Sequence, residues 1–207
     1  MIIAVDGPAA SGKGTIARAL ARHYGLPHMD TGLLYRAAAL SLLRRGGDPG
    51  DAAQALAACD LEGIDFSDPA LKDERTGGVA SQVSAYPGVR AALIERQRCF
   101  ATQAGGAVLD GRDIGTVIAP EADAKLFVTA SAEVRARRRH AELERLGRPL
   151  PLAEVLEDIR TRDERDWNRA SAPLRMAPGA EEIDTSALDV EGAIAAAIAS
   201  VERQIAR

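Results

Sequence analysis

The sequence predicts an α/β domain in which helices cover both faces of a parallel β-sheet. Two observations carry this prediction. Short apolar runs alternate along the chain with longer segments of helical periodicity, a pattern typical of parallel sheets. The glycine-rich stretch GPAASGKGT at residues 7–15 lies between the first such run and the first such helix. Ligands of these sheets bind beyond the carboxyl ends of the strands, so we expect the functional residues there.

The first strand, loop and helix occupy the N-terminal part of the chain. The run MIIAV at residues 1–5 is too short for a helix and is predicted to be a buried strand. After the glycine-rich loop, Ile16, Leu20 and Tyr24 recur at helical spacing. Gly25 ends this helix. The order strand, loop, helix is the context that a phosphate-binding loop requires.

The remaining elements follow in the same alternating order. PHMDTG at 27–32 predicts a second short strand and its turn, and GGDPGD at 46–51 ends the next helix. Residues 60–80 are polar and mixed, and no element is assigned to them. Further strands are predicted at 107–110, 124–130 and 181–184, and further helices at 33–45, 87–103, 133–146, 152–167 and 190–205.

Length and composition limit the class of protein. A chain of 207 residues with 46% hydrophobic residues suits one domain with a real core. A net charge of −4 creates no overall field that would attract nucleic acid. Cys59 and Cys99 lie in no metal-ligand spacing, so we expect buried free thiols. We see no signal peptide or transmembrane run and expect a cytoplasmic enzyme.

Residues 7–14 match the P-loop pattern G-x-x-x-x-G-K-[ST] except at its last position. Gly14 stands where a hydroxyl is expected to bind magnesium, and Thr15 comes one place late. The glycines let backbone N–H groups converge on one anion, and Lys13 adds a charge for the β- and γ-phosphates. A guanine-reading N-K-x-D is absent from the sequence, and a motor would need far more chain. A small kinase remains.

The predicted helix at 152–167 becomes charged on its apolar face. At about 100° per residue, Arg162, Asp166 and Arg169 share a stripe with Val155 and Ile159. A merely solvated charged face would lie opposite the apolar one. We therefore expect this helix to run out of the core into a cleft. A local ladder of salt bridges is the alternative.

A second basic cluster lies at residues 135–149. Arg135, Arg138 and Arg139 share one helical face, while Arg137 does not. A basic patch of this kind could bind RNA. No aromatic residue that could stack a base lies nearby, which argues against binding of single strands.

A third group consists of Thr31, Arg36 and Arg112. Thr31 and Arg112 follow two different predicted strands, and Arg36 lies one turn into a helix. Because the carboxyl ends of parallel strands are neighbours, we expect these side chains to meet. Arg36 alone could equally be an ordinary surface residue.

Several stretches together resemble one family. GKGT resembles the nucleoside monophosphate kinases, and VDGPAASGKGT, MDTGLLYRA, SQVSAYPGVRAALIERQR, LDGRDIGT and RDERDWNRASAPL are similar to the bacterial cytidylate kinases, in that family's order. The resemblance implies a single P-loop kinase domain at 1–207, with a short monophosphate-binding insertion at about 36–100 and a lid at about 131–150. Enterobacterial members carry a larger insert with a β-hairpin in the region matching 60–80, so we expect that hairpin to be lost here.

The resemblance also implies roles for individual residues. Those implied to bind ATP are Gly7, Pro8, Ala9, Ala10, Ser11, Gly12, Lys13, Gly14, Thr15 and Arg135. Those implied to bind CMP are Thr31, Arg36, Arg112 and Arg169 for phosphate, Arg162 and Asp166 for the ribose, and Ser81, Arg90 and Asp113 for the base. Those expected to act in transfer are Lys13, Arg112, Arg139 and Arg169. Asp110, at the end of a predicted strand, is placed to anchor a magnesium ion through water, although it could instead be a strand-end carboxylate in a turn.

Cytosine presents one amine donor and two acceptors, which a carboxylate and a guanidinium complement. Asp113 and Arg90 would supply these two groups, although Asp113 could instead pair with Arg112 or cap a turn. The resemblance implies that both substrates carry phosphates, so magnesium can be held largely by phosphate oxygens and water, and a hydroxyl ligand at Gly14 is not required.

The expected reaction is phosphoryl transfer from ATP to CMP or dCMP, with Mg²⁺ as cofactor and no general base. One alternative is a small-metabolite kinase of the shikimate or gluconate type, in which Asp30 would be the base. A second is a nucleotide-binding regulator without activity, against which Lys13 and the arginines argue. We expect a monomer that binds neither nucleic acid nor membrane.

Overall fold

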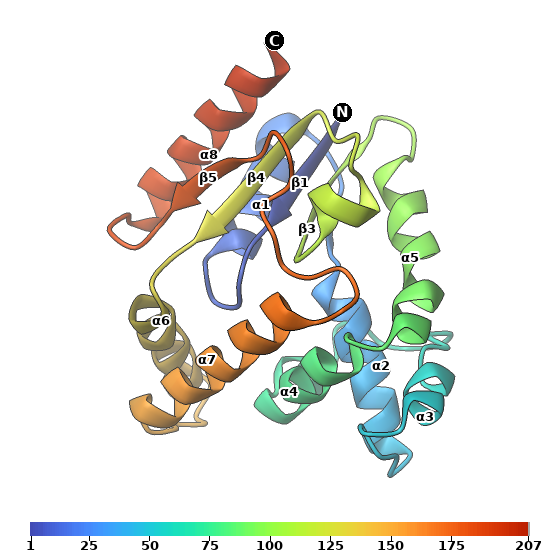
Figure 1. Ribbon diagram of the computed structural model, residues 1–207. Coiled ribbons are helices and arrows are strands. Elements are labelled where there is room, and N and C mark those ends of the chain that lie inside the picture. Colours follow the sequence, from blue (N-terminus) through green and yellow to red (C-terminus); the bar gives the residue numbers. More distant parts are fainter. Residues whose placement is uncertain (207) are drawn as a thin grey trace.

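Five parallel strands form the centre of the structure, a computed structural model that describes residues 1–206 (Figure 1). The strands are β1 (Ile2–Asp6), β2 (His28–Asp30), β3 (Ala107–Gly111), β4 (Ala124–Thr129) and β5 (Glu181–Asp184). Their order across the sheet is β2-β3-β1-β4-β5, and every neighbouring pair is parallel. The carboxyl ends of all these strands therefore open on one edge.

Helices cover the sheet and extend beyond its carboxyl edge. They are α1 (Lys13–Tyr24), α2 (Gly32–Arg44), α3 (Ala52–Ala57), α4 (Glu74–Val83), α5 (Pro87–Ala101), α6 (Ala132–Arg145), α7 (Leu152–Asn168) and α8 (Val190–Ile205), with a short 3₁₀ helix η1 (Pro69–Lys72) and a short π-helical turn η2 (Ile114–Ile118). Each strand and long helix predicted from the sequence is present. The sequence did not predict α3, α4, η1 or η2.

The core around the central strand explains why its residues are apolar without alternation. Ile3 and Val5 of β1 pack with α1 and α8 on one face of the sheet. Ala4 packs with Leu109 and Ile118 on the other face, which α5 and η2 cover. A strand buried on both faces is apolar throughout, and each large side chain buried in this way stabilises the fold by about 1.5–3 kcal/mol.

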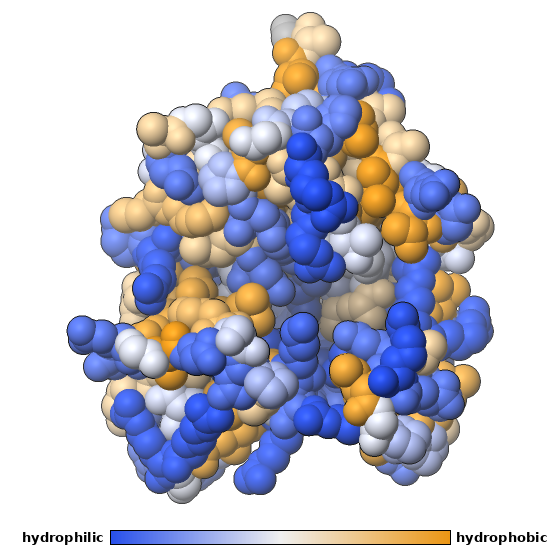
Figure 2. Space-filling view, turned by 180° about the vertical axis from the view of Figure 1, so that it is seen from behind, coloured by the Kyte–Doolittle hydropathy of each residue, from blue (hydrophilic) through white to orange (hydrophobic). Residues whose placement is uncertain are grey.

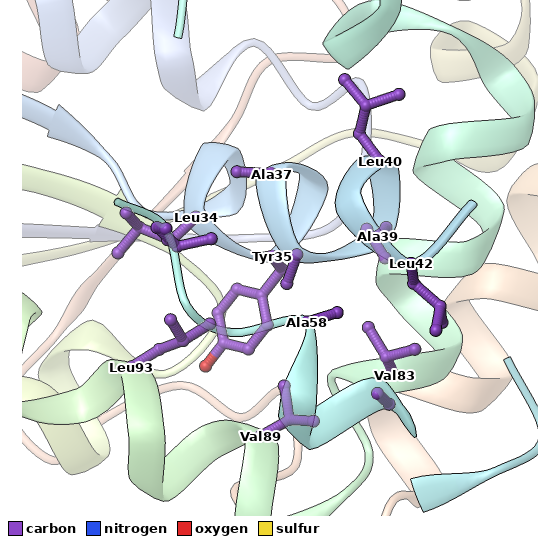
Figure 3. Close-up of a cluster of buried hydrophobic side chains, with 14 of the residues drawn as sticks. Leu34, Tyr35, Ala37, Ala39, Leu40, Leu42, Ala58, Val83, Val89 and Leu93 are labelled. Carbon is purple, nitrogen blue, oxygen red and sulfur yellow. The ribbon is translucent and has the colours of Figure 1, made fainter. Parts of the chain in front are cut away.

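A second core holds together the lobe formed by α2, α3, α4 and α5. Figure 3 shows the ring of Tyr35 from α2 beside Val89 and Leu93 of α5. This lobe covers most of the region predicted to form the monophosphate-binding insertion. Residues 60–80 contain no strand and instead carry η1 and the first part of α4.

A helical pair, α6 and α7, forms the third part of the molecule (Figure 1). Ala136 and Leu143 of α6 pack against Val155 and Ile159 of α7. The pair corresponds to the predicted lid and the helix that follows it. No helix of residues 1–206 has the length and apolar character needed to cross a membrane.

The expectation of two buried thiols is wrong for Cys99. Cys59 is half-buried, whereas Cys99 is exposed. The buried face of α5 includes Val89, Leu93 and Gln97. Cys99 lies about 200° from Gln97 around the helix and so faces solvent.

Candidate active site

A cleft of about 1390 Å³ opens at the carboxyl edge of the sheet. Its walls come from the glycine-rich loop, the lobe of α2, α4 and α5, and the α6–α7 pair. Figure 2 shows the molecule from behind, with a hollow near its middle that is bordered largely by hydrophilic side chains. The cleft lies where the topology of a parallel sheet predicts a ligand site.

The glycine-rich loop and the N-terminus of α1 form one end of the cleft. Gly12 caps α1 with a φ of +92°, and the residues from Ala9 to Thr15 line the cleft. A Cβ added at Gly7 would lie 2.0 Å from the carbonyl oxygen of Val128 in β4. Gly7 thus lets the loop leave β1 directly against its neighbouring strand. A helix N-terminus exposed in this way binds anions.

Lys13 supplies the positive side chain at this end. Its Nζ donates to the carbonyl oxygen of Pro8 at 3.3 Å. Burial lowers the pKa of Lys13 to about 8, with help from the nearby charge of Arg112, while Asp110 and Asp30 oppose the shift. An anion bound beside Lys13 would favour its charged form.

Two carboxylates stand side by side at the ends of β2 and β3. Asp30 and Asp110 are register partners, and burial together with Asp110 raises the pKa of Asp30. His28 Nε2 lies 2.7 Å from Asp110 Oδ1. A Cβ added at Gly14 would lie 3.6 Å from Asp110 Oδ2. The carboxylate of Asp110 therefore faces the position where the P-loop pattern expects a hydroxyl, and carboxylates suit the water shell of Mg²⁺.

The opposite end of the cleft is built from buried ion pairs. Arg90 pairs with Asp113, and both side chains are 7% exposed. Arg169 Nη2 lies 3.6 Å from Asp113 Oδ1 and, though buried, has no hydrogen-bond partner. The ring of Tyr35 lies beneath the guanidinium of Arg90, 5.8 Å away. Asp113 thus pairs with Arg90 and not with Arg112, the partner that the sequence left open. Burial raises the pKa of Asp113, and Arg90 and then Arg169 oppose this shift.

Arg112 pairs instead with the helix that the sequence singled out. Its Nε donates to Asp166 Oδ2 at 2.7 Å. Arg162 and Asp166 are buried together with Val155 and Ile159 on one face of α7. The prediction that the inward face of this helix becomes ionic where it meets a cleft is confirmed.

Glu74, at the first turn of α4, joins α6 to α7. Arg139 Nε donates to Glu74 Oε1 at 2.5 Å, and Arg162 Nη2 donates to Glu74 Oε2 at 3.1 Å. Arg36 lies in the same group, and burial, followed by the charges of Arg162 and Arg139, lowers its pKa to about 10. Sequence reasoning missed Glu74, because the helix that carries it was not predicted.

The arginines on the basic face of α6 make two different kinds of contact. Arg135 is buried, donates to Asp163 of α7 at 2.6 and 3.0 Å, and does not line the cleft. Arg138 does line it and reaches the carbonyl oxygen of Ser11 at 3.4 Å. Arg137 is exposed. The shared face was predicted correctly, but spacing alone could not decide which arginine meets the neighbouring helix.

The cleft brings together nearly all of the residues that the sequence predicted for the site. Those predicted residues that do not line it are Gly7, Pro8 and Arg135. It also extends to a wall that was not predicted, consisting of Thr185, Leu188, Asp189, Val190 and Ala193. These residues follow β5 directly, so their place after a strand was the one available signal.

A strand, glycine-rich loop and helix with a half-buried lysine, facing a second end lined with arginines, define a P-loop kinase. The sequence matches the family model of the cytidylate kinases over residues 3–203, and the chain belongs to this family. It is 57% identical over 205 residues to the cytidylate kinase of Rhodopseudomonas palustris strain HaA2, covering 98% of this chain and 96% of the relative. It is 58% identical over 202 residues to that of Xanthobacter autotrophicus, covering 98% and 97%.

Solved structures with the same fold are more distant in sequence. A gluconokinase from Sinorhizobium meliloti is 19% identical, with a TM-score of 0.53 over 99% of this chain and 93% of that one. An uncharacterized protein from Eubacterium ventriosum is 16% identical, with a TM-score of 0.55 over 98% of both chains. At these identities the likeness concerns the fold alone.

Proposed function

We propose that this chain transfers the γ-phosphate of ATP to CMP or dCMP. Membership of the cytidylate kinase family supports this reaction. The observation that carries the choice of acceptor is the buried pair of Arg90 and Asp113 at the end of the cleft opposite the P-loop. A carboxylate can accept from the amine of cytosine, and a guanidinium can donate to its two acceptors.

The donor nucleotide would lie along the P-loop and the wall after β5. Residues 7–15 would cradle its phosphates through backbone N–H groups, and Lys13 would neutralise the β- and γ-phosphates. The purine would extend toward Leu188 and Val190, near Arg138. Magnesium would arrive with ATP, and Asp110 would hold its water ligands.

The acceptor nucleotide would bind to side chains that pair with each other in this structure. Its phosphate would be held by Thr31, Arg36, Arg112 and Arg169, its ribose by Arg162 and Asp166, and its base by Ser81, Arg90 and Asp113. The Nη2 of Arg169 lies 3.6 Å from Asp113 without a hydrogen bond. This supports the assignment, since a buried donor without a hydrogen bond costs about 1–3 kcal/mol until a ligand satisfies it.

Catalysis would depend on alignment and charge neutralisation. The attacking phosphate oxygen is already an anion, so it needs no general base. Holding both nucleotides in line within one cleft supplies much of the rate. Arg112, Arg139 and Arg169, with Lys13, would carry the positive charge that the transferred group requires.

Release of ADP from ATP, measured with CMP, dCMP, UMP, AMP, gluconate and shikimate as acceptors, tests the proposal. We expect rapid turnover with CMP and dCMP and much slower turnover with the others. Turnover with gluconate or shikimate alone would favour a hydroxyl kinase that uses Asp30 as its base. Absence of turnover with every acceptor would favour a regulator that only binds nucleotides.

We also propose that the enzyme works as a monomer in the cytoplasm. The chain carries both ends of its cleft, from Lys13 to Arg169, and needs no residue from a second copy to complete it. Light scattering during size-exclusion chromatography, with and without nucleotides, gives the mass in solution. A dimer mass at micromolar concentration would contradict the monomer.

A further inference from the structure

Asp6 is a buried carboxylate at the end of the central strand. It is 3% exposed and does not line the cleft. Its Oδ1 accepts from the backbone N–H of Ile114 at 2.8 Å, and its Oδ2 accepts from that of Gly115 at 2.8 Å. One side chain on β1 thus fixes two successive peptide groups in the segment that follows β3.

These two N–H groups belong to the first residues of η2. Helix starts leave such groups without partners inside the helix. The residue before the first turn normally satisfies them, and aspartate is among the residues that do so best. Asp113 occupies this position, but its side chain makes no capping bond. Its carboxylate is directed to Arg90 and Arg169 instead.

We propose that Asp6 is a positioning residue for recognition of the acceptor's base, because it caps η2 in place of Asp113 and so leaves the Asp113 carboxylate free to face the cleft. The inference rests on the proposed function, in which Asp113 reads the base. Asp6 acts only through Asp113 and touches no substrate.

Asp6 prevents a local change in the conformation of the Asp113 side chain. Without Asp6, the N–H groups of Ile114 and Gly115 would be buried without partners, at a cost that the nearest carboxylate can remove. Aspartate side chains readily bond to backbone N–H groups one to three residues ahead. Asp113 would then turn from Arg90 toward its own backbone, and the complement to the cytosine amine would be lost.

The environment of Asp6 is consistent with a dedicated role. The pKa of Asp6 is raised to about 7, chiefly by burial and to a smaller extent by nearby Asp113, although the two backbone hydrogen bonds and Lys13 act in the opposite direction. A carboxylate in such a place is unfavourable unless its bonds are needed. A serine or asparagine would supply fewer acceptor oxygens for the two N–H groups.

The test compares the ratio of kcat/KM for CMP to that for UMP in four proteins: the wild type, Asp6→Asn, Asp113→Asn and the double variant. Asparagine keeps the shape of Asp6 but offers one acceptor oxygen and no charge. We expect Asp6→Asn to lower the ratio by about fivefold or more, with KM for ATP changed less than about twofold. Because Asp6 acts through Asp113, the double variant should show the same ratio as Asp113→Asn alone.

Asp51→Asn is the matched control. Asp51 caps α3 with the same kind of bonds, accepting from Ala53 N at 2.8 Å and Gln54 N at 3.1 Å, and it does not line the cleft. Loss of this cap should leave the CMP:UMP ratio unchanged. If Asp6→Asn is unfolded by circular dichroism, Asp6→Glu replaces it, with the same expected fall in the ratio, since the longer chain displaces both oxygens.

Three results would overturn the inference. One is an unchanged ratio in an active Asp6 variant. Another is an equal rise in KM for ATP and for CMP, which would show that Asp6 supports the segment after β3 in general and not recognition of the base. The third is an additive effect in the double variant. A wild type that does not prefer CMP to UMP would instead overturn the proposed function, so the two failures are distinguishable.

Discussion

The two ends of the cleft, which we call the donor end (the P-loop and Lys13) and the acceptor end (around Arg90 and Asp113), are built in opposite ways. At the donor end, one continuous stretch at residues 7–15 presents backbone groups and a single lysine. At the acceptor end, side chains converge from α2, α4, α5, α7 and the segment after β3. A backbone cradle recognises phosphate whatever base is attached. Side-chain pairs instead match a pattern of donors and acceptors, so under the proposed function separate parts of the protein recognise the phosphates of ATP and the base of the acceptor.

The two ends also differ in how their charges are balanced. Lys13 at the donor end donates only to the Pro8 carbonyl oxygen among the described residues, and its pKa is depressed. Guanidinium groups at the acceptor end already have carboxylate partners, in the pairs Arg90–Asp113, Arg112–Asp166 and Arg162–Glu74. Among residues 1–206, Lys13 therefore has no carboxylate ion pair to break when a phosphate binds, whereas the acceptor end must exchange protein anions for those of the substrate.

The largest effect should follow from removing the charge at the donor end. We expect Lys13→Ala to lower kcat by about 10³-fold, because that charge stabilises the phosphoryl group as it moves. The fold should stay intact, since a lysine with a lowered pKa contributes no stability through its charge at neutral pH. Turnover and thermal denaturation measure the two outcomes. Near-normal turnover would contradict the role of the P-loop.

The next effect concerns the base at the acceptor end. Asp113→Asn supplies an amide that can present either its oxygen or its NH₂ group to the base. It should therefore lower the ratio of kcat/KM for CMP to that for UMP by about ten- to a hundredfold. The control is Asp163→Asn, which alters the buried pair with Arg135 outside the cleft and should lower stability without changing the ratio. An unchanged ratio in an active Asp113→Asn enzyme would show that Asp113 does not read the base.

A smaller and one-sided effect is expected for the ribose contact. Asp166→Ala should raise KM for CMP by about tenfold, the loss of one charged hydrogen bond, while KM for ATP changes less than about twofold. Glu164→Ala provides the comparison, because Glu164 is exposed on the same helix and does not line the cleft. Equal rises in both KM values would mean that Asp166 only supports Arg112.

The smallest effect is a dependence of stability on pH at the donor end. With a folded-state pKa of about 8 and an ordinary value of 10.5, Lys13 binds fewer protons in the folded than in the unfolded chain between these pH values. The free energy of unfolding should therefore rise with pH across this window, relative to Lys13→Ala. Urea titrations of both proteins at pH 7.5, 9 and 10 measure the difference. A constant difference would mean that the lysine is not desolvated.

The sequence predicted the donor end well because that end is local. Spacing within residues 7–15 identified the P-loop, and the apolar runs around it identified the sheet. The inward ionic face of α7 was also visible, since a helix places Val155, Ile159, Arg162 and Asp166 in one row. These features depend on neighbours only a few residues apart.

The parts that were missed depend on distant neighbours. The segment of α4 contains Gly77 and Gly78, which lower helix propensity. A Cβ at Gly77 would lie 2.8 Å from Arg36 Nη2 and 2.9 Å from Arg162 Nη2. Gly77, one of the residues that kept α4 from being predicted, therefore makes room for two arginines of the site. The sequence alone gives no sign that Arg36, Gly77 and Arg162 share one small space.

The contact between Gly7 and β4 limits which amino acids a folded variant can carry at residue 7. Any side chain at residue 7 begins with a Cβ that would lie 2.0 Å from the carbonyl oxygen of Val128. Val128 is fixed within the paired strands β4 and β5 and cannot move aside. At Gly14, by contrast, an added Cβ meets only side-chain atoms of Arg18 and Asp110, at 3.5 and 3.6 Å. Saturation mutagenesis should thus recover folded protein from glycine codons alone at residue 7, and from alanine codons as well at residue 14.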